Sequence, residues 1–269
     1  LLHAGDIAYY EGTFAQYESA FFRVYADLLK DTPFFPTLGN HDATDGGPAY
    51  RALFSTGGLY YSFDWSNVHI TVLDSNQLYD SDTPMLAWAE QDLAATRKLW
   101  RVVVFHHPPF PVSDYKRDDP LCLLARNRIT PILERQGVHL VLSGHEHVYH
   151  RTQPRWNGQW QPQGLGTVYI TTGGGGSEHY NPVNESWTAA SSAAPHFLRV
   201  TAADSYLKVE SITHAGDLLD TWQITRAPAI LPDGVVDAAA FIPQLAPGGL
   251  ASILGWNLSG AAIPGWPIL

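Results

Sequence analysis

Four short segments of this chain carry side chains that bind hard metal ions. They are Gly5-Asp6-Ile7-Ala8-Tyr9, Gly39-Asn40-His41-Asp42, Phe105-His106-His107-Pro108 and Gly144-His145-Glu146-His147. Three of them follow an apolar run that is typical of a buried strand. Together they offer carboxylate, phenol, amide and imidazole groups, which is a donor mixture suited to a pair of cations. Two cations held close together form a site that hydrolyses phosphate esters.

The first segment offers two anionic oxygen donors. Asp6 follows a glycine at the end of an expected strand, and a ligand that bridges two cations must be anionic and reach both. Tyr9 lies three residues further on, and its phenolate is a hard donor suited to a trivalent ion such as Fe(III). The alternatives are a helix cap or turn for Asp6 and packing beside Tyr10 for Tyr9.

The second segment combines a neutral donor with two titratable groups. Asn40 offers a carbonyl oxygen, and His41 can donate a proton to a leaving group or hydrogen-bond a phosphate oxygen. Asp42 is expected to fix the tautomer of a neighbouring imidazole. The alternative is a polar turn, because Asn, His and Asp all suit turns.

The last two segments supply imidazoles. Successive side chains of an extended chain point in opposite directions, so only one residue of the pair His106 and His107 faces the site, and we favour His106 as the ligand. His145 and His147 lie two residues apart and can face the same side, one toward each cation. Glu146 then faces away. The alternative for either residue of the first pair is a hydrogen-bonded core histidine.

The elements that must position these groups alternate between strands and helices in the first two thirds of the chain. Helices are predicted over residues 13–30, 84–98 and 121–136, and strands over 1–4, 34–38, 101–105, 138–142 and 167–172. Residues 59–73 read as a hairpin, and 196–226 as three antiparallel strands. This pattern favours an α/β layered domain with mixed sheets. Ligands at the carboxyl ends of neighbouring strands converge on one crevice.

Composition excludes several classes of protein. The net charge is −10, so a broad electrostatic footprint for nucleic acid is absent, although bound cations can still attract an anionic substrate. The single cysteine, Cys122, allows no intrachain disulfide. No run of 18 apolar residues occurs, so no membrane span is predicted. With 269 residues and 45% hydrophobic content, a sizeable core is expected.

The carboxyl-terminal part of the chain differs in composition. Residues 227–234 are predicted to be a linker, and residues 235–269 contain no Lys, Arg or His. The latter resemble the start of a β-rich module found on secreted proteins of soil bacteria. This resemblance implies a secreted or periplasmic bacterial protein, although no signal peptide is visible in the sequence.

The four segments together resemble the calcineurin-like metallophosphoesterase superfamily, most closely the purple acid phosphatases. The family's ordered motifs are Asp-x-His, Gly-Asp-x-x-Tyr, Gly-Asn-His-Asp/Glu, a Val-x-x-His strand end and Gly-His-x-His. The last four are found here in order. Tyr9 is the discriminating residue, because most of the superfamily lacks this Fe(III) ligand. The resemblance covers residues 1–226, which we take as the catalytic domain.

The resemblance implies a role for each matching residue. Asp6 bridges the metals, Tyr9 and His147 bind the first, and three further ligands bind the second, namely Asn40, His106 and His145. The first metal would be Fe(III), and the second Fe(II), Zn(II) or Mn(II). The catalytic pair would be His41, which assists the leaving group or binds phosphate, and Asp42. The implied fold is a four-layer α/β/β/α sandwich of two mixed β-sheets.

Two departures from the family pattern affect the expectations. The Asp-x-His motif would precede Gly5, so the first site in this chain is expected to lack one carboxylate. The family's further substrate-binding histidine is replaced by the run Ser113-Asp114-Tyr115-Lys116-Arg117. Candidate substrate contacts are therefore Lys116, Arg151, Glu178 and His179, with solvated loop charges as the alternative for the first of them.

We predict an acid phosphatase that hydrolyses small phosphate monoesters by means of a metal-bound hydroxide. One alternative is a phosphodiesterase or nucleotide-cleaving enzyme of the same superfamily. The other is a binding module that keeps the fold and lacks activity. The expected missing carboxylate favours the inactive module, whereas His41, His145 and His147 favour an enzyme.

Overall fold

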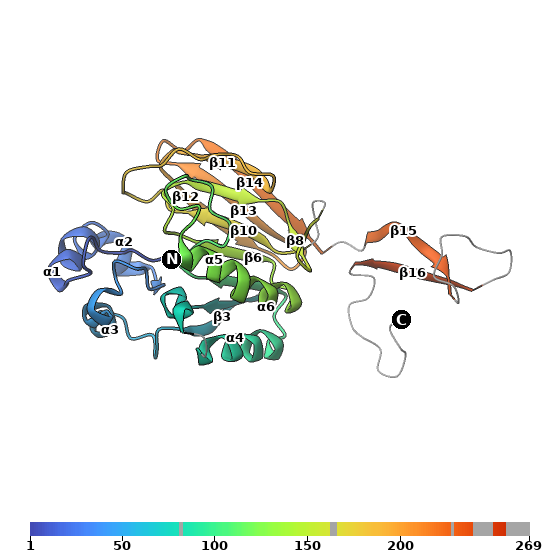
Figure 1. Cartoon of the computed structure of the whole chain (residues 1–269), viewed down its shortest axis with the longest axis horizontal. Helices are drawn as coiled ribbons and strands as arrows, with labels where there is room; N and C mark the ends of the chain where they lie inside the picture. Colours follow the sequence, from blue (N-terminus) through green and yellow to red (C-terminus); the bar gives the residue numbers. More distant parts are fainter. Residues whose placement is uncertain (81–82, 162–165, 227–228, 239–249, 257–269) are drawn as a thin grey trace.

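A seven-stranded mixed sheet forms the centre of the fold (Figure 1). The computed structural model describes residues 1–80, 83–161, 166–226, 229–238 and 250–256. The strands lie in the order β11-β7-β10-β6-β5-β4-β3. Their bounds are β3 Tyr61–Trp65, β4 Val68–Val72, β5 Trp100–Val104, β6 Leu140–Ser143, β7 Tyr149–Thr152, β10 Val168–Thr172 and β11 Thr188–Ser192.

The middle strands of this sheet run in the same direction. β4, β5, β6 and β10 are parallel, whereas β3, β7 and β11 pair antiparallel to their neighbours. β4 is buried along its whole length, as expected for a strand covered on both faces. The parallel arrangement brings the carboxyl ends of β5 and β6 to the same edge, where His106 and His145 follow.

Helices cover one face of the sheet. They are α4 Pro84–Ala95, α5 Pro120–Leu124 and α6 Thr130–Arg135, with the short helices η3 Ser75–Tyr79 before α4 and η4 Ala125–Ile129 between α5 and α6. Met85, Leu93 and Leu133 from these helices pack with Val103 and Val141 of the sheet in one buried cluster. Cys122 lies buried in α5 as a free thiol.

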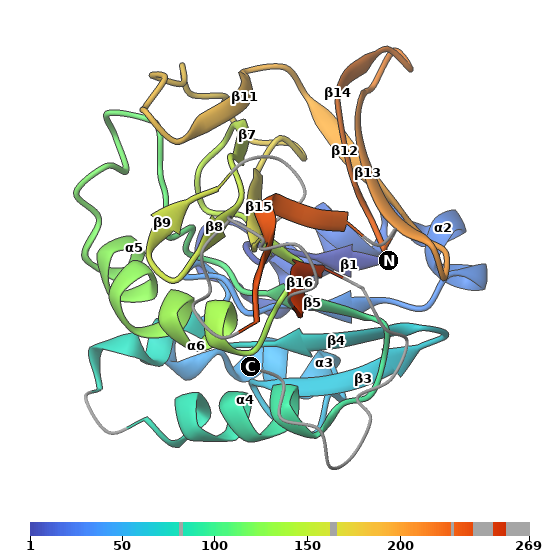
Figure 2. The same cartoon turned by 90° about the vertical axis from the view of Figure 1, so that its right-hand side faces the viewer.

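A three-stranded antiparallel sheet covers the opposite face. It consists of β12 His196–Ala202, β13 Tyr206–Thr213 and β14 Leu218–Thr225, as predicted for residues 196–226. Figure 2 shows α4 and this sheet on opposite sides of β3 and β4. Leu207, Val209 and Trp222 pack against Val102 and Leu140 of the large sheet. The predicted fold class, an α/β sandwich of two sheets with helices, is confirmed.

The amino-terminal region packs around a third cluster of buried residues. β1 Leu2–His3 pairs parallel with β2 Phe35–Pro36, and helices α1 Phe14–Tyr17, η1 Glu18–Phe22, α2 Ala26–Asp31, η2 Thr44–Gly46 and α3 Pro48–Leu53 gather beside them. Thr13 and Gln16 form a capping box at the start of α1. The helix predicted over residues 13–30 therefore starts as expected, but it passes through a π-helical turn before α2.

Part of the predicted linker over residues 227–234 forms a strand, and its role as a linker stays a prediction. Strand β15 Ala229–Asp237 begins inside it and pairs with β16 Ala251–Trp256, while β8 Arg155–Trp156 and β9 Gln159–Trp160 form a separate hairpin. The pairing register of β15 shifts between Ile230 and Val235, and a strand tolerates a proline such as Pro232 at an irregularity of this kind. Most of the predicted module at 235–269 lies outside the described residues.

Among the described residues, no helix has both the length and the apolar character needed to cross a membrane.

Candidate metal centre

The four segments singled out in the sequence meet at one edge of the sheets. Asp6 follows β1, Asn40 follows β2, His106 follows β5 and His145 follows β6. These strands end side by side, because β1 is paired with β2 and β5 with β6. The backbone nitrogen of His41 donates to Oδ1 of Asp6 at 3.0 Å, which ties the first two segments together.

One group of donor atoms has the spacing of a metal's ligands. Nε2 of His106 lies 3.1 Å from Oδ2 of Asp6, 3.1 Å from Oδ1 of Asn40 and 3.2 Å from Nδ1 of His145. The Asn40 oxygen lies 2.8 Å from the same His145 nitrogen. Ligands about 2.1 Å from a tetrahedral ion lie about 3.4 Å apart. A cation therefore fits among these atoms after a small expansion.

A second group of donors adjoins the first through Asp6. The Tyr9 phenol oxygen lies 3.4 Å from Oδ2 of Asp6 and 3.2 Å from Nε2 of His147. The Asp6 oxygen is thus shared between the two groups, which is the arrangement required of a bridging ligand.

Each of the three imidazoles is oriented by an oxygen on its outer side. Nδ1 of His106 donates to the Ala4 carbonyl at 2.8 Å, and Nδ1 of His147 donates to the Glu178 carbonyl at 2.8 Å. Nε2 of His145 contacts the Asp119 carboxylate at 3.0 Å. Because these oxygens only accept, the protons lie on the outer nitrogens. The inner nitrogens face the neighbouring donors, where a cation would bind them in place of any proton.

Asp119 is a site residue that sequence reasoning missed. Its Oδ1 caps helix α5 by accepting from the Leu121 nitrogen at 2.9 Å, while its Oδ2 holds His145. The pattern Asp119-Pro120 is typical of a helix start and indicates the cap. The contact with His145 depends on the tertiary position of the loop before α5, which no local pattern indicates.

His107 and Glu146 have supporting contacts. Nδ1 of His107 lies 2.7 Å from the Ser75 hydroxyl, although the ring is also near those of His106 and His145. The buried Glu146 carboxylate accepts from the backbone nitrogens of Val112 and Ser113. Glu146 thus faces away from the centre, as expected, and anchors the segment that follows His107.

Oδ2 of Asp6 and Nε2 of His106 lie 3.1 Å apart, and each group shifts the pKa of the other. Burial favours the neutral carboxyl, but the adjacent His106 and the His41 amide outweigh burial and lower the pKa of Asp6. Burial likewise disfavours a charged His106, and Asp6 outweighs it, so the pKa of His106 is raised. A bound metal ion would take the place of the proton that His106 shares with Asp6.

The other donors are held neutral. Burial raises the pKa of Tyr9, and the nearby Asp6 carboxylate adds to the shift, so its phenolate requires a cation beside it. Burial lowers the pKa of His145 to about 4, and the positive charges of His106 and Lys116 oppose its protonation further. A neutral imidazole is the form that binds a metal ion.

Two glycines allow the segments to approach this closely. A Cβ atom on Gly39 would overlap the backbone nitrogen and the side chain of Asp6. One on Gly144 would lie 2.7 Å from the Ala4 carbonyl oxygen. Both glycines precede ligand residues, so the close packing of strand ends explains their place in the motifs.

His41 lies beside the donors without joining them. Its ring packs at a tilt against that of Tyr9 with the centroids 4.4 Å apart, and its Nδ1 donates to the Tyr10 carbonyl at 2.7 Å. The proton on Nδ1 leaves Nε2 as the nitrogen that can exchange a proton with a bound molecule. This position is consistent with the predicted assistance to a leaving group.

The prediction that Asp42 orients an imidazole is wrong. Its fully buried carboxylate accepts from the backbone nitrogens of Ile7 and Gly39 at 3.0–3.1 Å and from the Tyr17 hydroxyl at 2.6 Å. The carboxylate binds these backbone nitrogens because they lie just beyond the ends of β1 and β2, where strand pairing no longer satisfies them. Asp42 therefore holds the loop that carries Asp6 and Tyr9.

Arg151, predicted as a substrate contact, has a different role. On β7 it forms a two-point ion pair with Asp220 of β14, through Nε at 2.6 Å and Nη2 at 3.2 Å. This partly buried pair satisfies the guanidinium and joins the two sheets, and the Tyr149 hydroxyl also donates to Asp220 at 2.6 Å. Sequence proximity to His147 was a misleading signal.

The remaining predicted substrate contacts lie at different distances from the centre. Lys116 is close enough for its charge to contribute to lowering the pKa of both His145 and His147, in each case after burial. Glu178 is exposed and reaches the centre only through its carbonyl. His179 lies near His196 of β12, whose pKa it helps to lower in addition to burial.

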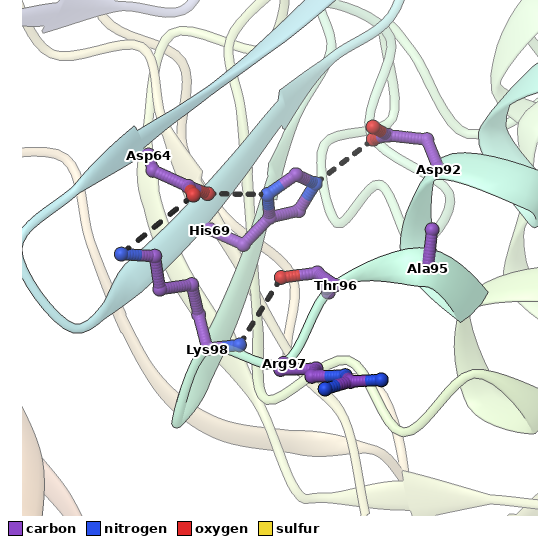
Figure 3. Close-up of a pocket in the computed structure, with 7 residues that line it drawn as sticks. All are labelled: Asp64, His69, Asp92, Ala95, Thr96, Arg97 and Lys98. Atoms are coloured by element: carbon purple, nitrogen blue, oxygen red, sulfur yellow. Dashed lines mark hydrogen bonds and ion pairs between the residues drawn. The ribbon is translucent and has the colours of Figure 1, made fainter.

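A separate cavity of about 500 Å³ lies at the opposite edge of the sheet, where β4 and β5 begin (Figure 3). His69 lies between two carboxylates there, with Nδ1 at 2.8 Å from Asp64 and Nε2 at 3.0 Å from Asp92. Lys98 approaches Asp64 at 3.6 Å. These charges neutralise one another, so we regard this cluster as structural.

The comparisons with known proteins agree with this geometry. Residues 1–149 match the model of the calcineurin-like phosphoesterase family. Purple acid phosphatase 18 of Arabidopsis thaliana is 27% identical over 240 residues, which is 81% of this chain and 52% of that protein. Acid phosphatase type 7 of Mus musculus is 27% identical over 66% of this chain and 48% of its own length. The chain thus spans about half the length of these relatives.

Solved structures share the fold at low sequence identity. The purple acid phosphatase PPD1 from yellow lupin seeds has a TM-score of 0.74 and 19% identity, over 83% of this chain and 46% of that one. GAP50 of Plasmodium, described as the anchor in the inner membrane complex, has a TM-score of 0.64 and 18% identity, over 83% of this chain and 77% of its own. One of these proteins is named as a phosphatase and the other as an anchor, so the shared fold does not by itself identify an activity.

Proposed function

The chain belongs to the calcineurin-like phosphoesterase family, and from this premise we propose that it hydrolyses phosphate esters at a centre of two metal ions. The observation that carries the proposal is the orientation of three imidazoles. His106, His145 and His147 each have the outer nitrogen fixed by an oxygen and the inner nitrogen beside Asn40, Asp6 or Tyr9. Structural histidines in a core have no reason to share this convergence.

We assign the ligands to two sites. Asn40, His106 and His145 would hold one ion and Tyr9 with His147 the other, and Asp6 would bridge them. Nitrogen and neutral oxygen donors at the first of these sites suit Fe(II), Zn(II) or Mn(II), whereas the phenolate of Tyr9 suits Fe(III). Such ions, when bound, would lower the pKa of a water molecule and polarise the phosphoryl oxygens.

The chain's own residues would contribute orientation and proton transfer. Asp119 and the carbonyls of Ala4 and Glu178 keep the imidazoles in one tautomer and one direction. His41, fixed through its Nδ1 contact with Tyr10, would present Nε2 to the leaving oxygen and protonate it. Lys116 would add positive charge beside the phosphate without serving as a metal ligand.

The favoured reaction is hydrolysis of small phosphate monoesters, as in an acid phosphatase. The names of the similar proteins from plants and mouse support this choice. An assay of a chromogenic monoester beside the matching bis-ester tests it, and the monoester is expected to react faster. A strong preference for the diester would favour the phosphodiesterase alternative. Hydrolysis of neither ester would favour an inactive module.

A spectrum tests the iron assignment separately. Iron-loaded, oxidised protein should absorb visible light through charge transfer from Tyr9 to Fe(III), and Tyr9→Phe should lack this band. Loss of the band in Tyr9→Phe while a Tyr10→Phe control keeps it would identify the ligand. A colourless iron-loaded wild type would contradict the purple-enzyme assignment but leave the two-metal proposal standing.

We also propose that the protein acts outside the cytoplasm, as a secreted or periplasmic enzyme. The resemblance of its carboxyl-terminal segment to modules of secreted proteins supports this location. Fractionation of expressing bacterial cells, with activity measured in each fraction, tests it.

A further inference from the structure

A row of aromatic rings crosses the candidate metal centre. From one end to the other the rings are those of Tyr10, His41, Tyr9, His147, Tyr180 and Tyr115. Neighbouring centroids lie 6.0, 4.4, 6.3, 4.6 and 5.3 Å apart in that order. Three members belong to the metal ligands or to the predicted proton donor. The remaining three, Tyr10, Tyr180 and Tyr115, have no role in the reaction as described so far.

The two ends of this aromatic row are open to solvent. Tyr10 is 72% exposed and Tyr115 is 75% exposed. Other tyrosines near the centre, such as Tyr17 and Tyr50, are buried and serve the core. Burial therefore does not account for the position of Tyr115, and most of its side chain is accessible to a ligand.

Backbone hydrogen bonds hold the loop that carries Tyr115. Glu146, between the ligands His145 and His147, binds the backbone nitrogens of Val112 and Ser113. A turn then follows, in which the Lys116 nitrogen donates to the Ser113 carbonyl at 3.1 Å. The turn places the Tyr115 ring against Tyr180, which is itself stacked on His147. The position of Tyr115 is thus fixed relative to the metal-binding imidazoles.

Charge beside the ring completes the arrangement. Nζ of Lys116 lies 5.0 Å from the centre of the Tyr115 ring. An aromatic surface and a cation are therefore adjacent, and they are connected to the candidate ligand His147 through the ring of Tyr180. A molecule with an anionic group joined to a flat apolar group matches both features.

We propose that Tyr115, supported by Tyr180, stacks on the leaving group and makes the enzyme selective for phosphate monoesters with a planar aromatic leaving group. This inference rests on the proposed function. A stacking contact between Tyr115 and an aromatic leaving group corresponds to a kcat/KM roughly 2- to 12-fold higher than for an equally large saturated leaving group.

Benzyl phosphate and cyclohexylmethyl phosphate provide the test, because both release a primary alcohol and differ mainly in the flatness of the ring. We expect wild-type, metal-loaded protein to show a ratio of kcat/KM of about fivefold in favour of benzyl phosphate. Tyr115→Leu should bring the ratio close to one, mainly through KM for benzyl phosphate, and Tyr115→Phe should retain it. The control Trp65→Leu alters an exposed aromatic residue at the opposite edge of the sheet and should leave the ratio unchanged.

The outcomes separate the two levels of the proposal. Equal hydrolysis of both esters by the wild type, or a ratio unchanged in Tyr115→Leu, overturns the aromatic selectivity and leaves the phosphatase intact. Hydrolysis of neither ester overturns the proposed function and the selectivity together.

Discussion

The carboxylate of Asp119 lies 3.0 Å from Nε2 of His145, a residue 26 positions further along the chain. The opposite nitrogen of the same ring faces Asn40 and His106. One carboxylate thus determines which nitrogen of His145 can bind a metal ion. It also couples the loop that carries Tyr115 and Lys116 to the metal centre, because that loop ends at Asp119.

Asp119→Asn should weaken metal binding. An amide nitrogen facing His145 cannot accept its proton, whereas the amide oxygen can still cap helix α5. Loss of a contact of this kind typically costs 10- to 100-fold in metal affinity. Competition with a chromogenic chelator for Zn(II) measures the effect, and the exposed neighbour Asp118→Asn is the matched control. Equal affinities of the two variants would show that Asp119 does not support His145.

Asp42→Asn should destabilise the fold. The carboxylate accepts from amide and hydroxyl donors, and the NH₂ group of Asn would face one of them without an acceptor. A loss of roughly 2–4 kcal/mol in the free energy of unfolding is expected, measured by urea denaturation. Asp45→Asn, at an exposed turn position with positive φ, should change little. Unchanged stability with lost activity would restore a direct catalytic role for Asp42.

Gly39→Ala should disrupt the centre with little effect on the rest of the fold. The new methyl group would overlap Asp6, so the bridging carboxylate must move. Displacement of a reacting group by about 1 Å can lower the rate on the order of 100-fold. Steady-state assays beside circular dichroism measure both effects. Gly175→Ala, where a Cβ meets nothing within 4 Å, is the control. A Gly39→Ala enzyme of normal rate would show that Asp6 does not require this approach.

The cluster in Figure 3 should make stability depend on pH. Burial opposes protonation of His69, but the hydrogen bonds with Asp92 and Asp64 outweigh burial and raise its pKa above the ordinary value of about 6.5. The stabilisation of the fold by protonated His69 is therefore complete below about pH 6.5, and it is lost as the pH rises through the raised pKa of His69. Burial favours neutral Asp92, but hydrogen bonds with His69 and Ser62 outweigh burial and lower its pKa. The stabilisation by the Asp92 carboxylate is therefore lost in acid, below about pH 4.

The difference in unfolding free energy between wild type and His69→Gln should accordingly be largest between about pH 4 and 6.5. The exposed His214→Gln provides the comparison. A difference that grows above pH 6.5 would contradict the assignment of a protonated His69.

The convergence of the candidate metal ligands was predictable because their positions follow from local pattern. Asp6, Asn40, His106 and His145 each follow a short strand, and parallel strands end at a common edge. The contacts that orient them were not predictable in the same way. Asp119 meets His145 through a folded loop, and Arg151 pairs with Asp220 across two sheets at a separation of 69 residues. Asp42 shows a different error. Its place in a motif predicts a contact with an imidazole, whereas its carboxylate binds backbone nitrogens.

Metal stoichiometry tests the central claim most directly. Purified protein, loaded with excess metal and freed of unbound ions, should contain two metal ions per chain by elemental analysis. His106→Ala should lower this number to about one, because Tyr9 and His147 retain the other ion. Fewer than two ions in the wild type, or two ions still bound in His106→Ala, would contradict the dinuclear centre described above.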